Sequence, residues 1–533
     1  MRVLFSFFLF FIFSCNPKKN HNQKEMYGIR YASGGETTSF YNQKNLEEVN
    51  LEEQNCAHGL SDLGKVKIHL IDRTTNKPSG ATKKYKDAIS LQEIDLTGVK
   101  GNPVSSDFIN SVLILQHKRD VKEGCVEEKI GTRSAMKCDS YKEELVSPGR
   151  EAHICKKEYG ENSLENHVLA AVASVQKTLE CYESFFPQNV SRPKIDLVVF
   201  PKNELVFNMK DGKKKITYKT DNAYHTSSVG LNTLPQIVFF PNSKHTDFFS
   251  PVTLNLGIGS HETGHYIFML YTGLAQNLVN FQAGLSNHLN YTIMTHDKDT
   301  VSNKREVSSR MVFGAINEGL ADAVATLCFL EKPYSSLAFS KEEAVIRDSS
   351  KDKMKYKEIS KDTETINIKV ANTGTVTDEI PKKLNEDRLR HFFSQNKTKT
   401  IKGRDDREID DKDEHHIGAI VTYGLFQFWK ALSPTDSKYD FLSDAWSKKS
   451  VEDKEKYLKE LRKMLIESIY HAGQVIPNKE PSVYLDDVIF SLLKGGMKKD
   501  NAGRLSVSDK VCDVLKKQFP INYIGFQNNF ECT

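Results

Sequence analysis

The sequence has 533 residues and a formal net charge of +4. Its 38% hydrophobic and 27% charged residues give a globular composition that excludes wholesale disorder and a fibrous chain. The small net charge gives no support for nucleic-acid binding. One apolar run, at the N-terminus, is too short to span a bilayer, so the pattern also argues against a polytopic membrane protein.

The first 14 residues have the pattern of an export signal, because Arg2 precedes about a dozen apolar residues. The end of this run, up to Cys15, resembles the lipobox of bacterial lipoproteins. The resemblance implies cleavage before Cys15, its lipidation and a membrane attachment through acyl chains. Asn16 after the cysteine implies the outer membrane by the same resemblance. A plain secreted protein is the alternative, and residues 15–55 are expected to form a flexible tether.

The cysteine count agrees with export. Of nine cysteines, eight remain when Cys15 is set aside, an even number that suits a compartment in which disulfides persist. Two local pairs are compatible with the spacing, Cys125–Cys138 and Cys512–Cys532. Cys328 lies in an apolar helical stretch, where a buried free thiol is an equally good interpretation.

The predicted elements change character along the chain. Short β-type runs at 66–71, 89–96 and 111–115 predict a β-rich accessory or pro-like domain over 56–160. A lobe over 161–275 follows, with a helix at 163–186 capped by Ser163, strands at 195–200 and 236–240, and a helix at 254–272. The lobe over 276–533 is predicted to be mostly helical, with helices at 310–330, 417–432, 451–471, 483–493 and 507–519. The densely charged residues 341–414 predict an insertion or surface excursion.

The helix predicted at 254–272 contains His261-Glu262-Thr263-Gly264-His265, an HExxH motif. Residues four apart lie on one face of a helix, so both imidazoles can reach one zinc ion. Glu262 then lies where it can take a proton from a water molecule that the zinc has acidified. The motif on its own also occurs by chance in helices.

A catalytic zinc needs a third protein ligand. Glu318 and Asp322 are again four residues apart, on a helix that is otherwise rich in Ala, Val and Leu. Carboxylates on such a helix are costly unless they are paired or bind a metal. We therefore expect Glu318 to bind the zinc and Asp322 to accept the N–H of His261. The alternative is the solvated edge of an amphipathic helix.

These motifs resemble the gluzincin metallopeptidases, the thermolysin-like and fungalysin-like families, whose third-ligand helix carries N-E-x-x-[SA]-D. Here that pattern is matched by residues 317–322. The resemblance implies that Asn222 and Ala223 bind the substrate backbone. It also implies that His415, in a D-x-H-x-I-G-like segment, stabilises the oxyanion, with His416 as the runner-up. The acidic residues just before His415, over 405–414, are interpreted as a solvated loop.

The sequence thus predicts an α+β fold, a two-lobed zincin metallopeptidase with a mixed sheet, an active-site helix and a helical lobe. The predicted function is a zinc-dependent metalloendopeptidase of the cell envelope, acting on a peptide or protein substrate. Two other classes remain open. One is a zinc-binding envelope lipoprotein that binds a partner without turnover, against which the intact Glu262 argues. The other is a structural lipoprotein in which the motifs are fortuitous.

Overall fold

The computed structural model describes twenty segments of the chain. They are residues 62–71, 88–114, 125–130, 133–138, 150–186, 192–199, 205–210, 213–218, 222–226, 234–240, 251–271, 292–296, 304–330, 347–356, 378–383, 407–433, 438–475, 482–499, 505–520 and 530–532. The predicted leader, Cys15 and the tether lie outside the described residues.

The first β-type runs form an antiparallel sheet of β1 (Asp62–Ile71), β2 (Ile89–Gly101) and β3 (Val104–Ser105). Along β1 the side chains of Val66, Ile68 and Leu70 are buried and those between them are less so, as the two-residue period of a half-buried strand requires. These residues join the same hydrophobic core as the central helices.

The central sheet is mixed, with strand order β11-β12-β8-β4-β7. Its strands are β4 (Ile109–Ile114), β7 (Arg150–Glu151), β8 (Ile195–Val199), β11 (Ala223–Thr226) and β12 (Gln236–Phe239). The inner strands β4, β8 and β12 run parallel. Parallel neighbours need a crossover connection, and α2 (Leu164–Tyr182) lies in the one between β4 and β8. The sheet therefore takes strands from both sides of residue 160, where the sequence predicted a boundary between domains.

Helix α2 begins where the sequence predicted, because Ser163 caps it. The hydroxyl of Ser163 accepts a hydrogen bond from the backbone N–H of Asn166 at 3.1 Å.

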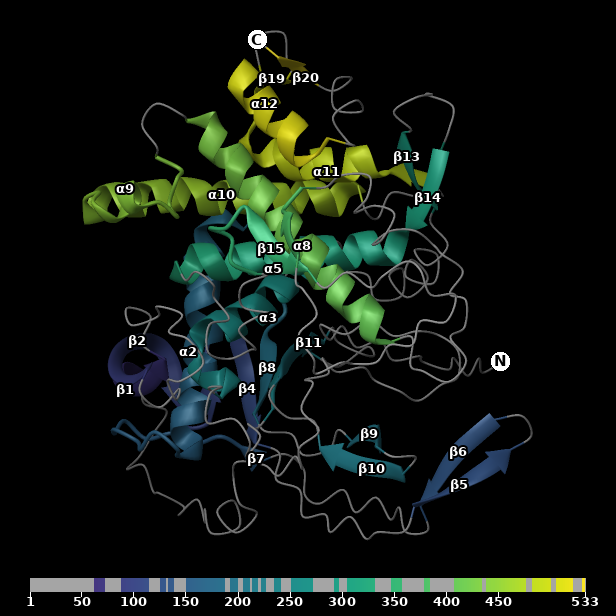
Figure 1. Cartoon of the computed structure of the whole chain (residues 1–533). Coiled ribbons are helices and arrows are strands. Elements are labelled where there is room, and N and C mark those ends of the chain that lie inside the picture. The colour runs from purple at the N-terminus through teal and green to yellow at the C-terminus, as the bar shows by residue number, and fades with distance from the viewer. Residues whose placement is uncertain are drawn as a thin grey trace, which may run out of the picture.

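Three further helices cross at the centre of the molecule: α3 (Leu256–Tyr271), α5 (Ser309–Phe329) and α8 (Arg407–Leu432). Helix α3 packs between the sheet and α5, and α8 crosses α5 (Figure 1). Every residue of α3 is buried.

The start of α8 corrects the prediction for the acidic run. Residues 407–414 were expected to be loop, with the helix beginning at 417, but α8 begins at Arg407. Acidic side chains interact favourably with the positive end of the helix dipole. The run of Asp and Glu therefore suits the first turns of a helix as well as it suits a solvated loop.

The C-terminal region is mostly helical, which together with the two sheets confirms the predicted α+β fold. It contains α9 (Asp444–Ser447), α10 (Val451–Val475), α11 (Leu485–Leu493) and α12 (Asp509–Gln518). The remaining strands are β5 (Cys125–Ile130), β6 (Arg133–Cys138), β9 (Leu205–Lys210), β10 (Lys213–Tyr218), β13 (Thr292–His296), β14 (Lys304–Ser308), β15 (Lys353–Tyr356), β16 (Asp378–Pro381), β17 (Ser482–Tyr484), β18 (Lys498–Lys499), β19 (Leu505–Val507) and β20 (Phe530–Cys532). Within the described segments, no helix is both long and apolar enough to cross a membrane.

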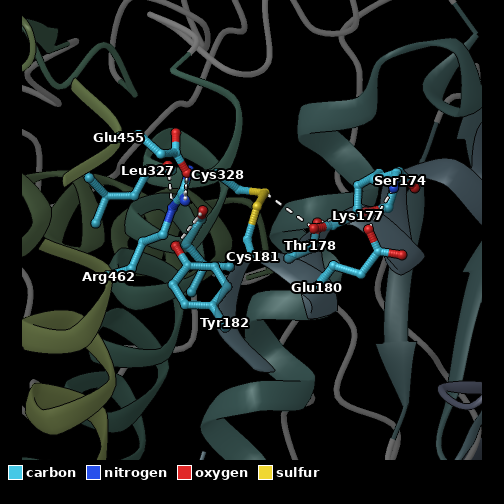
Figure 2. The surroundings of a disulfide bond; sticks show 11 residues. Ser174, Lys177, Thr178, Glu180, Cys181, Tyr182, Leu327, Cys328, Glu455 and Arg462 are labelled. Carbon is cyan, nitrogen blue, oxygen red and sulfur yellow. Dashed lines mark hydrogen bonds and ion pairs between the residues drawn. A yellow bond between two sulfur atoms is a disulfide. The ribbon is translucent and has the colours of Figure 1, made fainter. Parts of the chain in front are cut away.

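A disulfide joins Cys181 at the end of α2 to Cys328 at the end of α5, across 147 residues of sequence (Figure 2). The interpretation of Cys328 as a free thiol is therefore wrong. Cys328 is also only partly buried, and local apolar character does not reveal a partner that far away.

The predicted local disulfides are only partly described. Cys512 is also disulfide-bonded, to a cysteine whose side chain lies outside the described residues. Cys125 and Cys138 occupy paired positions of the β5–β6 hairpin, and their side chains lie outside the described residues. Both predicted pairs stay predictions.

Candidate metal centre

The middle of α3 supplies the two histidines of the HExxH motif. Because His261 and His265 are four residues apart, their rings lie on one face of the helix, with ring centroids 4.5 Å apart. Glu262 between them is also buried. The apolar and small residues on both sides of the motif allow the whole helix to lie inside the core.

Helix α5 brings Glu318 to these histidines. Its Oε2 lies 3.2 Å from Nε2 of His261, and its Oε1 lies 3.7 Å from Nε2 of His265. One ligand atom from each of the three residues can be chosen so that all lie within 4.8 Å of one another. Each residue is at most 4% exposed. The structure therefore brings together the three residues that the sequence predicted as ligands.

Glycines at the helix crossings allow this close approach. A Cβ atom on Gly264 of α3 would lie 2.7 Å from Cα of Ala321 on α5. A Cβ atom on Gly319 of α5 would lie 2.6 Å from the backbone oxygen of Gly418 on α8. Any larger residue at these two positions would push the helices apart, and with them the side chains of the centre.

Asp322 lies one turn beyond Glu318 and contacts the other side of His261. Its Oδ1 is 2.9 Å from Nδ1 of His261. A proton held at Nδ1 by this contact leaves Nε2 facing Glu318 as the nitrogen available to a metal. Burial alone would lower the pKa of His261, but the carboxylates of Asp322 and Glu318 outweigh it and raise that pKa to about 9. In the metal-free site a proton therefore competes for Nε2.

The other two ligands are held in the protonation states that a metal needs. Burial would raise the pKa of Glu318, but the imidazoles of His415, His265 and His261 lower it well below its usual value. The pKa of His265 is lowered, chiefly by burial. A deprotonated carboxylate and a neutral imidazole both have a lone pair to offer.

His415 completes the cluster from α8. Its Nε2 lies 3.3 Å from Oε2 of Glu318, and its side chain is buried. The side chain of the runner-up, His416, lies outside the described residues. The structure therefore places His415 beside the three ligands, and the choice between the two histidines rests on that placement alone.

Arg347 is a member of the site that the sequence did not predict. Its guanidinium nitrogens lie 3.1 Å from Oδ1 of Asp322 and 4.0 Å from Oε2 of Glu318, and its side chain is buried. Arg347 falls within residues 341–414, which were interpreted as an insertion or surface excursion. This part of that range instead reaches the centre of the molecule. A single arginine in a densely charged stretch has no local pattern that marks it as buried.

Asn222 and Ala223 lie at the edge of the central sheet, where β11 is the terminal strand. The backbone N–H of Phe240 donates to the carbonyl oxygen of Asn222 at 2.8 Å. Hydrogen-bonded and non-bonded pairs alternate along an antiparallel ladder, so the backbone groups of Ala223 and His225 face away from β12. Within the described residues, no strand pairs with that outer side of β11.

Two side chains near this edge are buried without a partner among the described residues: the amide nitrogen of Asn222 and both ring nitrogens of His225. Burial, and then the neighbouring His265, lower the pKa of His225 well below its usual value. Its ring lies edge-on to Tyr266 of α3 at a centroid distance of 6.3 Å. His225 was not singled out from the sequence, and only its position next to Ala223 on one strand connects it to the predicted substrate edge.

The donor set fits zinc. Two imidazole nitrogens and one carboxylate are the ligands of catalytic zinc sites that leave a further position for water or substrate. The three donors are buried, and Asp322 orients one of the imidazoles.

Comparisons of the chain with protein-family models, with curated proteins and with solved structures gave no match.

Proposed function

We propose that the chain is a zinc-dependent peptidase that hydrolyses peptide bonds. The observation that carries the proposal is the buried cluster of His261, His265 and Glu318. It gains support from the position of Glu262 within the same helix turn as the two histidines. Zinc bound by the three ligands would polarise the scissile carbonyl and make a water molecule more acidic.

The residues around the ligands have complementary tasks in this proposal. Glu262 accepts a proton from the attacking water and later delivers it to the leaving amine nitrogen. His415 donates a hydrogen bond to the carbonyl oxygen as negative charge develops on it. Asp322 keeps the proton of His261 on Nδ1. The products are a free carboxyl group and a free amine, so one water molecule is consumed for each bond broken.

The substrate would bind as an extra strand on the outer edge of β11. The outward backbone groups of Ala223 and His225 provide one donor and one acceptor each for an extended peptide, which is the usual way in which a free sheet edge recognises a peptide. Asn222, at the start of the strand, has a buried amide nitrogen that a substrate oxygen would satisfy. The strand is close to the ligands, because β11 packs against α3.

The localisation remains a proposal from the sequence. Export and lipidation at Cys15 would hold the enzyme on the cell envelope, with the outer membrane as the expected site. A peptide or protein in that compartment would then be its substrate.

The Glu262→Gln variant tests the function. We expect it to bind zinc as the wild type does and to hydrolyse a peptide library at least 100-fold more slowly, because a general base contributes about 10²–10⁴-fold. Glu452→Gln, at an exposed glutamate in the first turn of α10, is the matched control and should keep wild-type turnover.

The same digest, run with and without a chelator, separates the alternatives. Wild-type protein that binds zinc but shows no chelator-sensitive cleavage would favour a partner-binding module without turnover. Wild-type protein that takes up no zinc would reject the metal centre. Normal hydrolysis by Glu262→Gln would reject the assigned base.

A further inference from the structure

Two buried cations lie outside the three helices of the metal centre: Arg347, which contacts the centre, and Lys382, which contacts the turn that follows Arg347. Arg347 is 3% exposed and Lys382 is 1% exposed. Burying a charge costs several kcal/mol unless it is paired or hydrogen-bonded. Such residues therefore need specific partners, and the partners show what each cation holds in place.

Lys382 holds the turn that follows Arg347. Its Nζ donates a hydrogen bond of 2.6 Å to the backbone oxygen of Asp348, and its own backbone N–H donates to the oxygen of Asp352 at 2.8 Å. The ammonium also lies 5.9 Å from the ring centroid of Tyr423 on α8, the helix that carries His415. Lys382 thus holds the turn near its start, at Asp348, and at its end, at Asp352.

The turn itself is closed by local hydrogen bonds. Oδ1 of Asp348 accepts from the backbone N–H of Ser350 at 2.9 Å and from its hydroxyl at 2.6 Å. The backbone N–H of Lys351 donates to the oxygen of Asp348 at 3.1 Å. A turn braced in this way gives Arg347, its first residue, a defined position.

The carboxylates around Lys382 also favour its charged form in this position. Burial lowers the pKa of Lys382 to about 8, while the carboxylates of Asp348, Asp322 and Asp352 act in the opposite direction. Asp322 is the partner of His261 in the metal centre. The contacts connect Lys382 to the centre through the turn and its first residue, Arg347.

We propose that Lys382 is a positioning residue of the metal centre: it holds the 347–352 turn so that Arg347 stays against Asp322 and Glu318. Arg347 then neutralises a buried carboxylate that orients a zinc ligand. This inference rests on the zinc site of the proposed function, although the contact between Lys382 and the turn does not.

The first test uses metal-free protein and amide hydrogen exchange. We expect Lys382→Met to speed exchange of the amides in 347–352 at least tenfold, because the brace on Asp348 is lost. The variant should still fold, since the backbone N–H of Lys351 continues to satisfy the Asp348 oxygen. Lys383→Met, at the neighbouring and partly exposed lysine, is the matched control and should leave the exchange unchanged. If Lys382→Met does not melt cooperatively, Lys382→Gln takes its place.

The second test measures zinc affinity by competition with a chelator. We expect Lys382→Met to weaken zinc binding roughly 10- to 100-fold, because it releases Arg347 and losing an outer-shell partner usually has an effect of that size, and Lys383→Met to have no effect. Arg347→Met should weaken it at least as much. The double variant should be no weaker than Arg347→Met, because Lys382 acts through that arginine.

Three results would overturn the inference: unchanged exchange in Lys382→Met, faster exchange with unchanged zinc affinity, or losses that multiply in the double variant. A wild-type protein that binds no zinc would instead reject the proposed function. In that case the exchange experiment would still decide whether Lys382 braces the turn. Zinc binding without peptide hydrolysis would leave the inference intact.

Discussion

His167 on α2 shows what burial does to a single imidazole that has no part in the proposed metal centre. Its Nδ1 lies 2.6 Å from the hydroxyl of Thr253, and burial lowers its pKa from 6.5 to about 3. The unfolded chain binds a proton at this residue below pH 6.5, while the folded chain does not bind one until about pH 3. Stability that is fully present above pH 6.5 is therefore lost as the pH falls through this window.

The His167→Gln variant tests this link. We expect its free energy of unfolding in metal-free protein to fall less steeply between pH 6.5 and pH 4.5, by up to about 1.4 kcal/mol per pH unit, because one titrating group is removed. Urea titrations at several pH values measure the slope. His153→Gln, at an exposed histidine, should keep the wild-type slope. Equal slopes for His167→Gln and wild type would contradict the assignment.

At the scale of the secondary-structure elements, the crossing of α3 and α5 decides whether the predicted site residues meet. Each helix carries its own pair of predicted site residues four positions apart, and the pairs can meet because Gly264 lies against Ala321. Helices α5 and α8 also approach closely, where Gly319 lies against Gly418. Small residues at a crossing are thus as much a condition of the candidate metal centre as its three predicted ligands.

A methyl group at Gly264 should separate the two ligand helices. We expect Gly264→Ala to lower the free energy of unfolding by about 1–3 kcal/mol, the usual cost of overpacking, and to weaken zinc binding because Glu318 moves away from the imidazoles. Thermal melts and chelator competition measure the two effects. Gly160→Ala, where an added Cβ meets nothing within 4 Å, is the control. Normal zinc affinity in Gly264→Ala would show that the crossing tolerates more volume than its geometry indicates.

At the scale of the whole molecule, the Cys181–Cys328 disulfide fastens α2, which lies in the crossover connection of the sheet, to α5, which carries Glu318 and Asp322. Two hydrogen bonds reinforce this junction (Figure 2): the hydroxyl of Tyr182 donates to the oxygen of Val324 at 2.9 Å, and Nε of Arg462 donates to the oxygen of Leu327 at 3.2 Å. The junction therefore connects α2, the ligand helix α5 and α10.

Removal of this disulfide should destabilise the whole protein. A cross-link across 147 residues contributes about 5 kcal/mol in the chain-entropy model, and natural disulfides typically contribute 2–5 kcal/mol. We expect the double variant Cys181→Ser, Cys328→Ser to lose about 3 kcal/mol or more in a urea titration. Ser184→Ala, at a neighbouring residue after α2, should cost far less. A double variant with the same free energy of unfolding as the wild type would contradict the expected contribution of this disulfide to stability.

The sequence by itself determined the local features of the protein. The helical period placed His261 with His265 and Glu318 with Asp322, Ser163 marked the start of α2, and the β-type runs indicated the strands. Each of these features depends on residues a few positions apart, because a helix or strand turns sequence spacing directly into a shared face.

Only the tertiary structure decided which of these faces meet. The approach of α3 to α5, the edge position of β11 among the described strands, the partner of Cys328 and the burial of Arg347 and Lys382 all depend on segments far apart in the chain. The same local pattern of a charged stretch fits a fully solvated surface or a turn that carries a buried arginine. Its environment is set by the elements that pack over it, and no short-range period encodes that packing.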